Sequence, residues 1–235
     1  MNQKNDLYIN APLVETVFEI RFPGEPAIEC HRDIFFEKVR DIYPKILVPK
    51  LISGQPIALE PYRFECEDST YGVMVSLNKF GIYCRKYEGF EKFKDEILKI
   101  SKIFGELFKI KKLNRTGLRY INIIPFTRED STIPIKKILN FNINLPENIS
   151  VNLKNLNIVF ESETDGGCIT TRIEPAISQD KTQEVIFLDF DYAKEKNLNF
   201  NSLEKYLNES HKHTKTFFEE LITSDYKKVM KGDII

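Results

Sequence analysis

The chain has no tryptophan, few cysteines and no long apolar run. No two of its cysteines have the two-residue spacing of a zinc framework or a redox motif, so we expect reduced thiols at Cys30, Cys66, Cys84 and Cys168. No stretch approaches the roughly 18 apolar residues of a membrane span, and the first six residues lack the apolar core of a signal peptide. The sequence therefore predicts a cytoplasmic protein that does not enter a membrane.

Two further absences limit the function. The chain contains no phosphate-binding loop, no dinucleotide fingerprint, no Gly-x-Ser-x-Gly elbow and no His-Glu-x-x-His helix, which disfavours the common cofactor enzymes. Its 34 Lys and Arg are balanced by 35 Asp and Glu, so no net field is available to hold a polyanion. No cofactor is predicted, and nucleic acid stays open as a partner but is not indicated by the charge.

Apolar and aromatic residues are abundant. Among 235 residues, 42% are hydrophobic and 18 are Phe, which is enough to form a packed core. The length is above the commonest domain size but suits a single unit of mixed structure. We therefore expect one globular domain over residues 1–235.

Alternating side chains predict many strands. Residues 14–22 place Thr16, Phe18 and Ile20 on one side and Glu15, Glu19 and Arg21 on the other, which is the period of a strand. Short polar turns between neighbouring strands permit only antiparallel pairing, and Gly166-Gly167 marks a hairpin. Further strands are predicted at 62–67, 71–77, 80–87, 118–124, 156–163, 168–174 and 185–192.

Apolar residues at helical spacing predict two long helices and a short one. A nearly unbroken stripe predicts a helix over residues 90–110, and a second over residues 201–223 would be capped by Asn201 with Glu204 reaching back. A short helix carries apolar residues between Ile34 and Tyr43 and ends before Pro44, and residues 135–141 could form a helical turn or two.

These elements predict an α+β fold. The antiparallel sheet is expected in two halves, each followed by a long amphipathic helix packed on one side. The halves would span residues 1–125 and 150–235, joined by a proline-punctuated segment at 126–149.

Charged residues recur at even spacing along the strands, so they share one face of the sheet. If the sheet curls, this face becomes a cavity in which carboxylates hold Mg²⁺ or Mn²⁺ and arginines clamp phosphates. If it does not, the charges form the wet face of a single-layer sheet, which is the more common arrangement. If this face binds a metal ion, the predicted ligands are Glu163, Glu174, Asp189 and Asp191.

Four residues are candidates for binding an anion or a partner: Arg115, Arg119, Arg172 and His211. Arg119 lies on an apolar strand, where we favour an ion pair with a neighbouring carboxylate, such as Glu19 or Glu174, over anion binding, because buried charges usually occur in pairs. His211 interrupts an apolar helical stripe, so we favour an inward histidine bonded to a carbonyl over a base or metal ligand. Gly117 is expected to allow a bulge or close packing.

Four segments together resemble a known family. They are the Pro12-Leu-Val-Glu15 start, the segment Tyr87-Glu-Gly-Phe-Glu-Lys-Phe93, the run Gly117-Leu-Arg-Tyr-Ile-Asn122, and the helix with His211 and Phe218. The chain resembles a sporadically distributed prokaryotic family of similar length, whose function is uncharacterised. The resemblance implies mobile genes and an association with defence or toxins, but no substrate, cofactor or catalytic residue.

The leading functional hypothesis is a non-enzymatic binding or regulatory module with a protein partner or a homo-oligomeric state. It depends on the absence of any assignable catalytic constellation. The alternative is a metal-dependent phosphohydrolase or nucleotidyl-type enzyme that uses the strand carboxylates and arginines.

Overall fold

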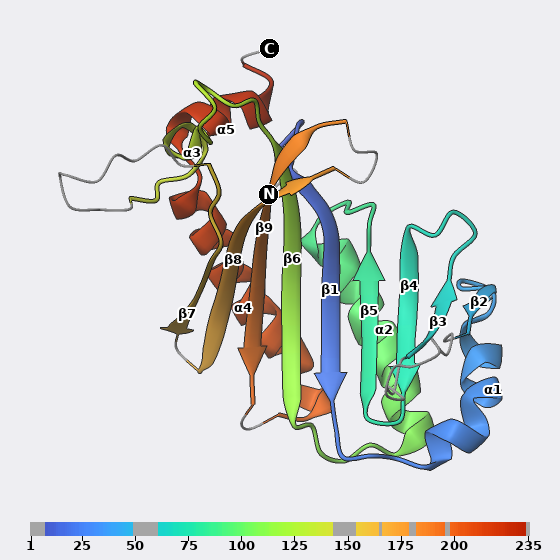
Figure 1. The fold of residues 1–235 in the computed structure, drawn as a ribbon. Coiled ribbons are helices and arrows are strands. Elements are labelled where there is room, and N and C mark those ends of the chain that lie inside the picture. Colours follow the sequence, from blue (N-terminus) through green and yellow to red (C-terminus); the bar gives the residue numbers. More distant parts are fainter. Residues whose placement is uncertain are drawn as a thin grey trace, which may run out of the picture.

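The computed structural model describes residues 8–48, 61–142, 154–164, 166–178, 182–195 and 198–233. These residues form a nine-stranded antiparallel sheet combined with helices (Figure 1), which confirms the predicted α+β class and the antiparallel pairing. No helix in these ranges is both long and apolar enough for a membrane span.

The strand order is β2-β3-β4-β5-β1-β6-β9-β8-β7. The strands are β1 (Leu13–Arg21), β2 (Lys45–Leu47), β3 (Tyr62–Glu65), β4 (Tyr71–Ser76), β5 (Lys79–Cys84), β6 (Arg115–Pro125), β7 (Ile158–Thr164), β8 (Gly167–Ile177) and β9 (Glu184–Lys194). The helices are α1 (Ala27–Val39), α2 (Phe90–Phe108), α3 (Ile135–Ile138), α4 (Leu203–Leu221) and α5 (Ser224–Lys231), and a 3₁₀ turn, η1 (Phe200–Ser202), precedes α4.

The helices α2 and α4 lie side by side on one face of the sheet (Figure 1). The apolar members of each alternating strand point towards them, so Phe18, Leu118 and Phe190 are fully buried. At the β2–β5 side of the sheet, the ring of Phe35 in α1 meets the ring of Phe104 in α2 edge to face, with centroids 5.7 Å apart. This layer of aromatic and branched side chains is the hydrophobic core.

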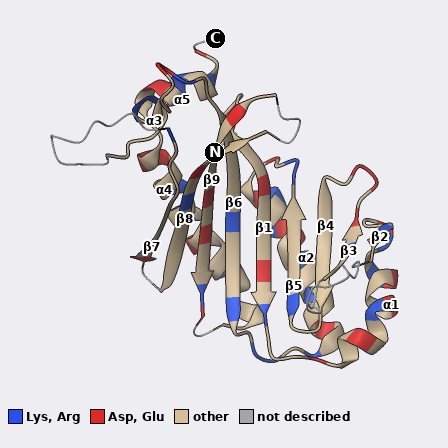
Figure 2. Ribbon diagram, viewed as in Figure 1, with Lys and Arg blue, Asp and Glu red and all other residues tan. Residues whose placement is uncertain are grey.

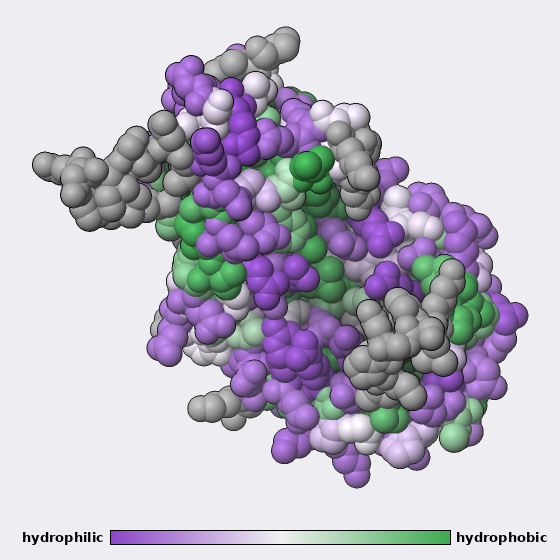
Figure 3. Space-filling model, viewed as in Figure 1, coloured by the Kyte–Doolittle hydropathy of each residue, from purple (hydrophilic) through white to green (hydrophobic). Residues whose placement is uncertain are grey.

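The other face of the sheet carries the charged members of the alternation (Figure 2), and we call it the open face. Figure 3 shows a hydrophilic band across it and a more apolar area towards its β7–β9 side. Ile121 on β6 and Phe187 on β9 alternate onto the same face as Arg119 and Asp189 and are only partly buried. Among the described residues no helix covers the open face, which matches the prediction of a single-layer sheet with one wet face.

The strands of the two predicted halves form one continuous sheet. β6, which was assigned to the first half, pairs with β1 on one side and along its length with β9 on the other. The predicted joining segment includes α3, as the helical pattern indicated, and its residues 143–149 lie outside the described residues.

Several element boundaries differ from the predictions. α1 begins at Ala27, well before Ile34, but it is kinked at His31, whose backbone angles are not helical, so the predicted helix corresponds to the part of α1 that follows the kink. The predicted cap at Asn201 is wrong. The cap is Asn199, whose side chain accepts from the Ser202 amide at 3.0 Å, because η1 extends the helical region upstream. The short strand β2 and the helix α5 were not predicted.

Candidate functional site

The predicted arginines meet two of the predicted carboxylates on the open face (Figure 2). Arg119 on β6 makes a bidentate ion pair with Asp189 on β9, with N–O distances of 2.7 and 2.8 Å. Arg172 on β8 approaches the same carboxylate at 3.5 Å, and Arg115 bonds Asp191 at 2.7 Å. Five of the predicted residues therefore form two neighbouring groups of ion pairs across three adjacent strands, Arg119 and Arg172 with Asp189, and Arg115 with Asp191, and we call the two groups together the open-face network.

Arginines compensate both aspartates of this network. The Asp189 side chain is 1% exposed, and both of its carboxylate oxygens accept hydrogen bonds. Burial lowers the pKa of Arg119, but its hydrogen bonds to Asp189 outweigh this and raise the pKa above its ordinary value. The predicted ion pair of Arg119 with a carboxylate of a neighbouring strand is confirmed, but the partner is Asp189 and neither Glu19 nor Glu174. Arg119 lies opposite Asp191 in the β6–β9 ladder and reaches diagonally to Asp189.

The remaining predicted carboxylates lie outside this network. Glu163 is exposed near the end of β7, and the Glu174 carboxylate accepts only a 3.4 Å hydrogen bond from Asn157. Within the described ranges, no group of three His, Cys, Asp or Glu side chains is arranged to hold a metal ion. The open face thus brings arginines to aspartates and does not cluster the four predicted metal ligands.

Gly117 allows close packing on the open face. A Cβ atom at this position would lie 2.6 Å from Nη1 of Arg115, so the guanidinium lies directly over the glycine. This agrees with the predicted packing role, because only a residue without a side chain lets Arg115 lie flat on the strand.

His211 lies on the opposite, helix-covered face of the sheet. Its Nδ1 is 2.9 Å from the Tyr120 hydroxyl, and its ring stacks on Phe90 with centroids 3.9 Å apart. The partner of Nδ1 in the described structure is thus a phenol, because Tyr120 faces the helix from β6, and the predicted carbonyl contact of His211 stays a prediction. His211 is partly buried and is held by an aromatic ring and a hydrogen bond.

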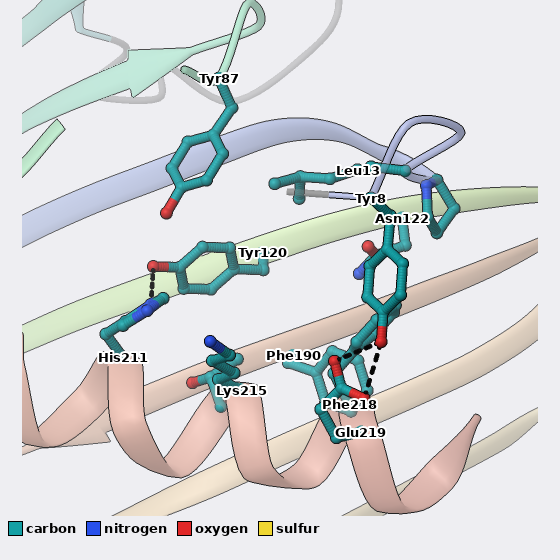
Figure 4. Close-up of a pocket in the computed structure, with 13 residues that line it drawn as sticks. Tyr8, Leu13, Tyr87, Tyr120, Asn122, Phe190, His211, Lys215, Phe218 and Glu219 are labelled. Atoms are coloured by element: carbon teal, nitrogen blue, oxygen red, sulfur yellow. Dashed lines mark hydrogen bonds between the residues drawn. The ribbon is translucent and has the colours of Figure 1, made fainter. Parts of the chain in front are cut away.

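His211 borders a pocket between α4 and the sheet, which we call the α4 pocket (Figure 4). Its volume is about 110 Å³. One face of α4 supplies lining residues at helical spacing, namely His211, Thr214, Lys215, Phe218 and Glu219. Facing them are Tyr120 and Asn122, two apart on β6, with Phe190 from β9, the register partner of Tyr120.

The N-terminal segment closes one end of the α4 pocket. Pro12 and Leu13 line it, and the Tyr8 hydroxyl lies 2.9 Å from both carboxylate oxygens of Glu219. The Lys227 ammonium in α5 is 3.3 Å from the same carboxylate. The charge of Glu219 is thus compensated by a hydroxyl and an ammonium group (Figure 4 shows the Tyr8 contact).

Two hydroxyl groups in the lining are buried and make no hydrogen bond of ordinary length in the described structure, although one of them, the Tyr87 phenol, lies close enough to Tyr120 for the two to affect each other's pKa. They belong to Tyr87, which lies between β5 and α2, and to Thr214, which is 3% exposed. Burial raises the pKa of Tyr87 and of Tyr120 well above the ordinary phenol value. Both phenols are therefore protonated near neutral pH and act as hydrogen-bond donors rather than bases.

Sequence reasoning placed His211 inward but did not find the α4 pocket. Its missed members include Tyr8, Tyr87, Tyr120, Thr214 and Lys215. The signal for the α4 members was the three- and four-residue spacing from His211 to Glu219. The other signal was the set of four segments on which the family resemblance depends, because each of them contributes to the pocket lining.

The chain matches no protein-family model, and comparison with curated proteins finds no match. The resemblance to the sporadically distributed prokaryotic family therefore stays a prediction, and the function has to be argued from the site.

Proposed function

We propose that this protein is a non-enzymatic module that binds one small organic molecule in the α4 pocket. The observation that carries the proposal is the buried hydroxyl of Thr214 in the pocket lining, which has no partner in the described structure. A buried polar group without a hydrogen bond costs about 1–3 kcal/mol. A ligand with a hydrogen-bond acceptor would recover this free energy. A void left by imperfect packing would not, because it offers the hydroxyl no acceptor.

The lining supports binding rather than catalysis. Its described residues include no cysteine, serine or aspartate, and the one glutamate among them, Glu219, is held by Tyr8 and Lys227. The phenols of Tyr87 and Tyr120 stay protonated, so neither is a general base. A mostly apolar pocket with a few convergent donors is the usual form of a small-molecule site.

The alternative of a metal-dependent phosphohydrolase receives no support from the open face. That activity would need carboxylates free to bind Mg²⁺ or Mn²⁺ and arginines free to bind phosphate. Asp189 and Asp191 are instead paired with Arg119 and Arg115. These ion pairs support a structural role in fixing the β6–β9 register.

The remaining expectations extend the proposal. We infer a cytoplasmic module with a protein partner or a second copy, and the partly buried Ile121 and Phe187 on the open face favour a contact there. If the chain consists of two halves, each with its long amphipathic helix, then the α4 pocket lies where the two halves meet. Tyr87 and Tyr120 come from the first half, and Phe190 and His211 come from the second.

Recovery of the bound molecule tests the proposal. The protein is purified from its native host, denatured, and its released small molecules are identified by mass spectrometry. We expect a near-stoichiometric compound from the parent and none from Thr214→Phe, which fills the pocket. The matched control is Thr216→Phe, because Thr216 is exposed on the same helix.

Two results together would refute the proposal. The first is that the parent and Thr214→Phe release the same compounds, or none. The second is that fractionated host metabolites leave the thermal stability of the parent unchanged. A ligand at one hundred times its dissociation constant should stabilise the protein by about 2.7 kcal/mol, which such a measurement resolves.

A further inference from the structure

Asn122 is a polar residue on the core-facing side of β6. The alternation of the strand puts it on the same side as Leu118, Tyr120 and Ile124, and it is only 3% exposed. Asparagine is disfavoured in strands, and a polar group is costly to bury unless it is hydrogen-bonded. The side chain of Asn122 lines the α4 pocket, so the pocket offers a reason for its position.

A β-bulge lies beside Asn122. β1 pairs with β6 at Leu13 and Asn122 and again at Glu15 and Ile121, so Val14 is an extra residue in β1. Bulges interrupt a ladder and are frequent next to functional sites. Leu13, on the near side of this bulge, lines the α4 pocket together with Asn122. The irregularity in the sheet thus occurs where β1 meets the pocket.

The carboxamide of Asn122 is used only in part. Its Nδ2 donates a hydrogen bond to the carbonyl oxygen of Leu188, its register partner on β9, over 3.2 Å. A carbonyl oxygen can only accept, so the group that faces it is the amide nitrogen. Within the described ranges, the amide oxygen accepts no hydrogen bond and the second N–H donates none. One planar group at the pocket wall therefore offers an acceptor and a donor.

The surroundings of this carboxamide favour a neutral ligand. In the described lining, the Glu219 carboxylate is already bonded by Tyr8 and Lys227, and Lys215 is also engaged. The register partners of Asn122 in the two adjacent strands are leucines. A charged group next to Asn122 would lack a partner of opposite charge, and burying such a group costs far more than burying a neutral one.

The remaining wall favours an apolar body on the ligand. Leu13, Phe190 and Phe218 line the pocket around Asn122 (Figure 4). Apolar walls with a few placed polar groups are typical of sites in which the polar groups set the orientation and the specificity. Asn122 is such a polar group.

We propose that Asn122 determines the specificity of the α4 pocket, and that the ligand is a neutral molecule with an amide edge on an apolar body. By an amide edge we mean an N–H donor beside a carbonyl oxygen or a ring nitrogen. The Asn122 oxygen accepts from the N–H of the ligand, and the free N–H of Asn122 donates to the acceptor of the ligand. Asparagine reads the edge of adenine in DNA in the same two-point way. This inference depends on the proposed function, because it names the ligand class of the same pocket.

Three probe compounds of nearly the same shape test the ligand class. They are benzamide, acetophenone and benzoate, and their binding to the purified full-length chain is measured by calorimetry after removal of any co-purified compound. We expect benzamide to bind most tightly. Acetophenone has a methyl group in place of the amino group and should bind about tenfold more weakly, because the Asn122 oxygen loses its donor. Benzoate should also bind at least about tenfold more weakly, since it brings an unpaired charge and a second acceptor.

A variant and a matched control test the role of Asn122. Asn122→Leu keeps the approximate size of the side chain and removes the carboxamide, so the ratio of the benzamide and acetophenone affinities should fall from about ten to about one. A purely structural role of Asn122 would leave this ratio unchanged. Asn114→Leu, at an exposed position just before β6, should keep the ratio of the parent.

Equal affinity of the parent for benzamide and acetophenone, or an unchanged ratio in Asn122→Leu, would overturn the assignment. If none of the three probes binds, the compound that the parent but not Thr214→Phe releases after purification from the host decides. A compound with an amide edge supports the assignment, whereas one without it shows that the ligand class is wrong and leaves the proposed function standing. If extraction and the host metabolites both show nothing, both proposals fail.

Discussion

Removing the hydroxyl of Tyr87 should stabilise the protein, which is the opposite of the usual effect of trimming a buried side chain. The hydroxyl is buried and makes no hydrogen bond of ordinary length among the described residues, and the nearby Tyr120 phenol is already bonded to His211, so the folded state carries most of the desolvation cost of the Tyr87 hydroxyl. That cost is about 1–3 kcal/mol for a hydroxyl, and Tyr87→Phe keeps the ring and its edge-to-face contact with Phe93. We expect the unfolding free energy of the ligand-free protein to rise by about 1 kcal/mol, the lower limit of this range.

The same substitution at Tyr206 is the matched control. The Tyr206 hydroxyl is 2.9 Å from the carbonyl oxygens of both Thr116 and Tyr192, and the side chain is 3% exposed. Tyr206→Phe leaves these carbonyls without that donor, so it should lower the unfolding free energy by about 1–3 kcal/mol.

Urea denaturation followed by circular dichroism measures both changes. For a chain of this length, each 1 kcal/mol corresponds to about 2–4 °C in the melting temperature, which gives an independent check. If Tyr87→Phe destabilises the ligand-free protein as much as Tyr206→Phe does, then Tyr87 has a partner in the folded state. The Tyr87 hydroxyl would then add nothing to the argument for an unfilled binding site.

Three further changes follow from the same structure. Arg119→Met should lower the unfolding free energy by about 3 kcal/mol in urea denaturation, because it deprives the buried Asp189 of its bidentate partner; a loss below about 1 kcal/mol would mean that the pair is only a surface contact. Gly72→Ala should cost about 1–3 kcal/mol, since its Cβ would lie 2.3 Å from the hydrogen-bonded Tyr83 hydroxyl, whereas Gly24→Ala, with no atom closer than 3.8 Å, should melt like the parent. Burial raises the pKa of several tyrosines, so their contribution to stability is complete below pH 10 and is lost as the pH rises above it, by about 1.4 kcal/mol per pH unit for each group. Unfolding free energies that stay constant from pH 9 to pH 11.5, with tyrosine ionisation followed at 295 nm, would contradict this account.

The secondary structure could be predicted where local periodicity decides it. The alternation in β1, the stripe in α2 and the glycine turn between β7 and β8 each depend on residues close together in the chain. The helix starts could not be placed as well, because a single side-chain contact decides them. Asn199 caps the region before α4 and Asn201 does not, although the two asparagines are only two residues apart.

The site could be predicted only in part, because register and distant contacts decide it. Sequence reasoning grouped Arg115, Arg119, Arg172, Asp189 and Asp191 on one face, which needs only the period of a strand. It could not give the diagonal partner of Arg119, which depends on how β6 aligns with β9. The α4 pocket was missed for the same reason, because segments from Tyr8 to Glu219 meet there.

The position of β6 has a consequence for how the chain folds. Its two neighbours are β1, from the beginning of the described chain, and β9, which ends at Lys194. During synthesis, one edge of β6, which is eleven residues long, stays unpaired until β9 has been made. In the same way, one edge of β1 stays unpaired until β6 has been made. Such long-range closure slows folding and exposes a strand edge to pairing with other chains. A chain truncated after Pro125 should therefore aggregate rather than fold as an independent half.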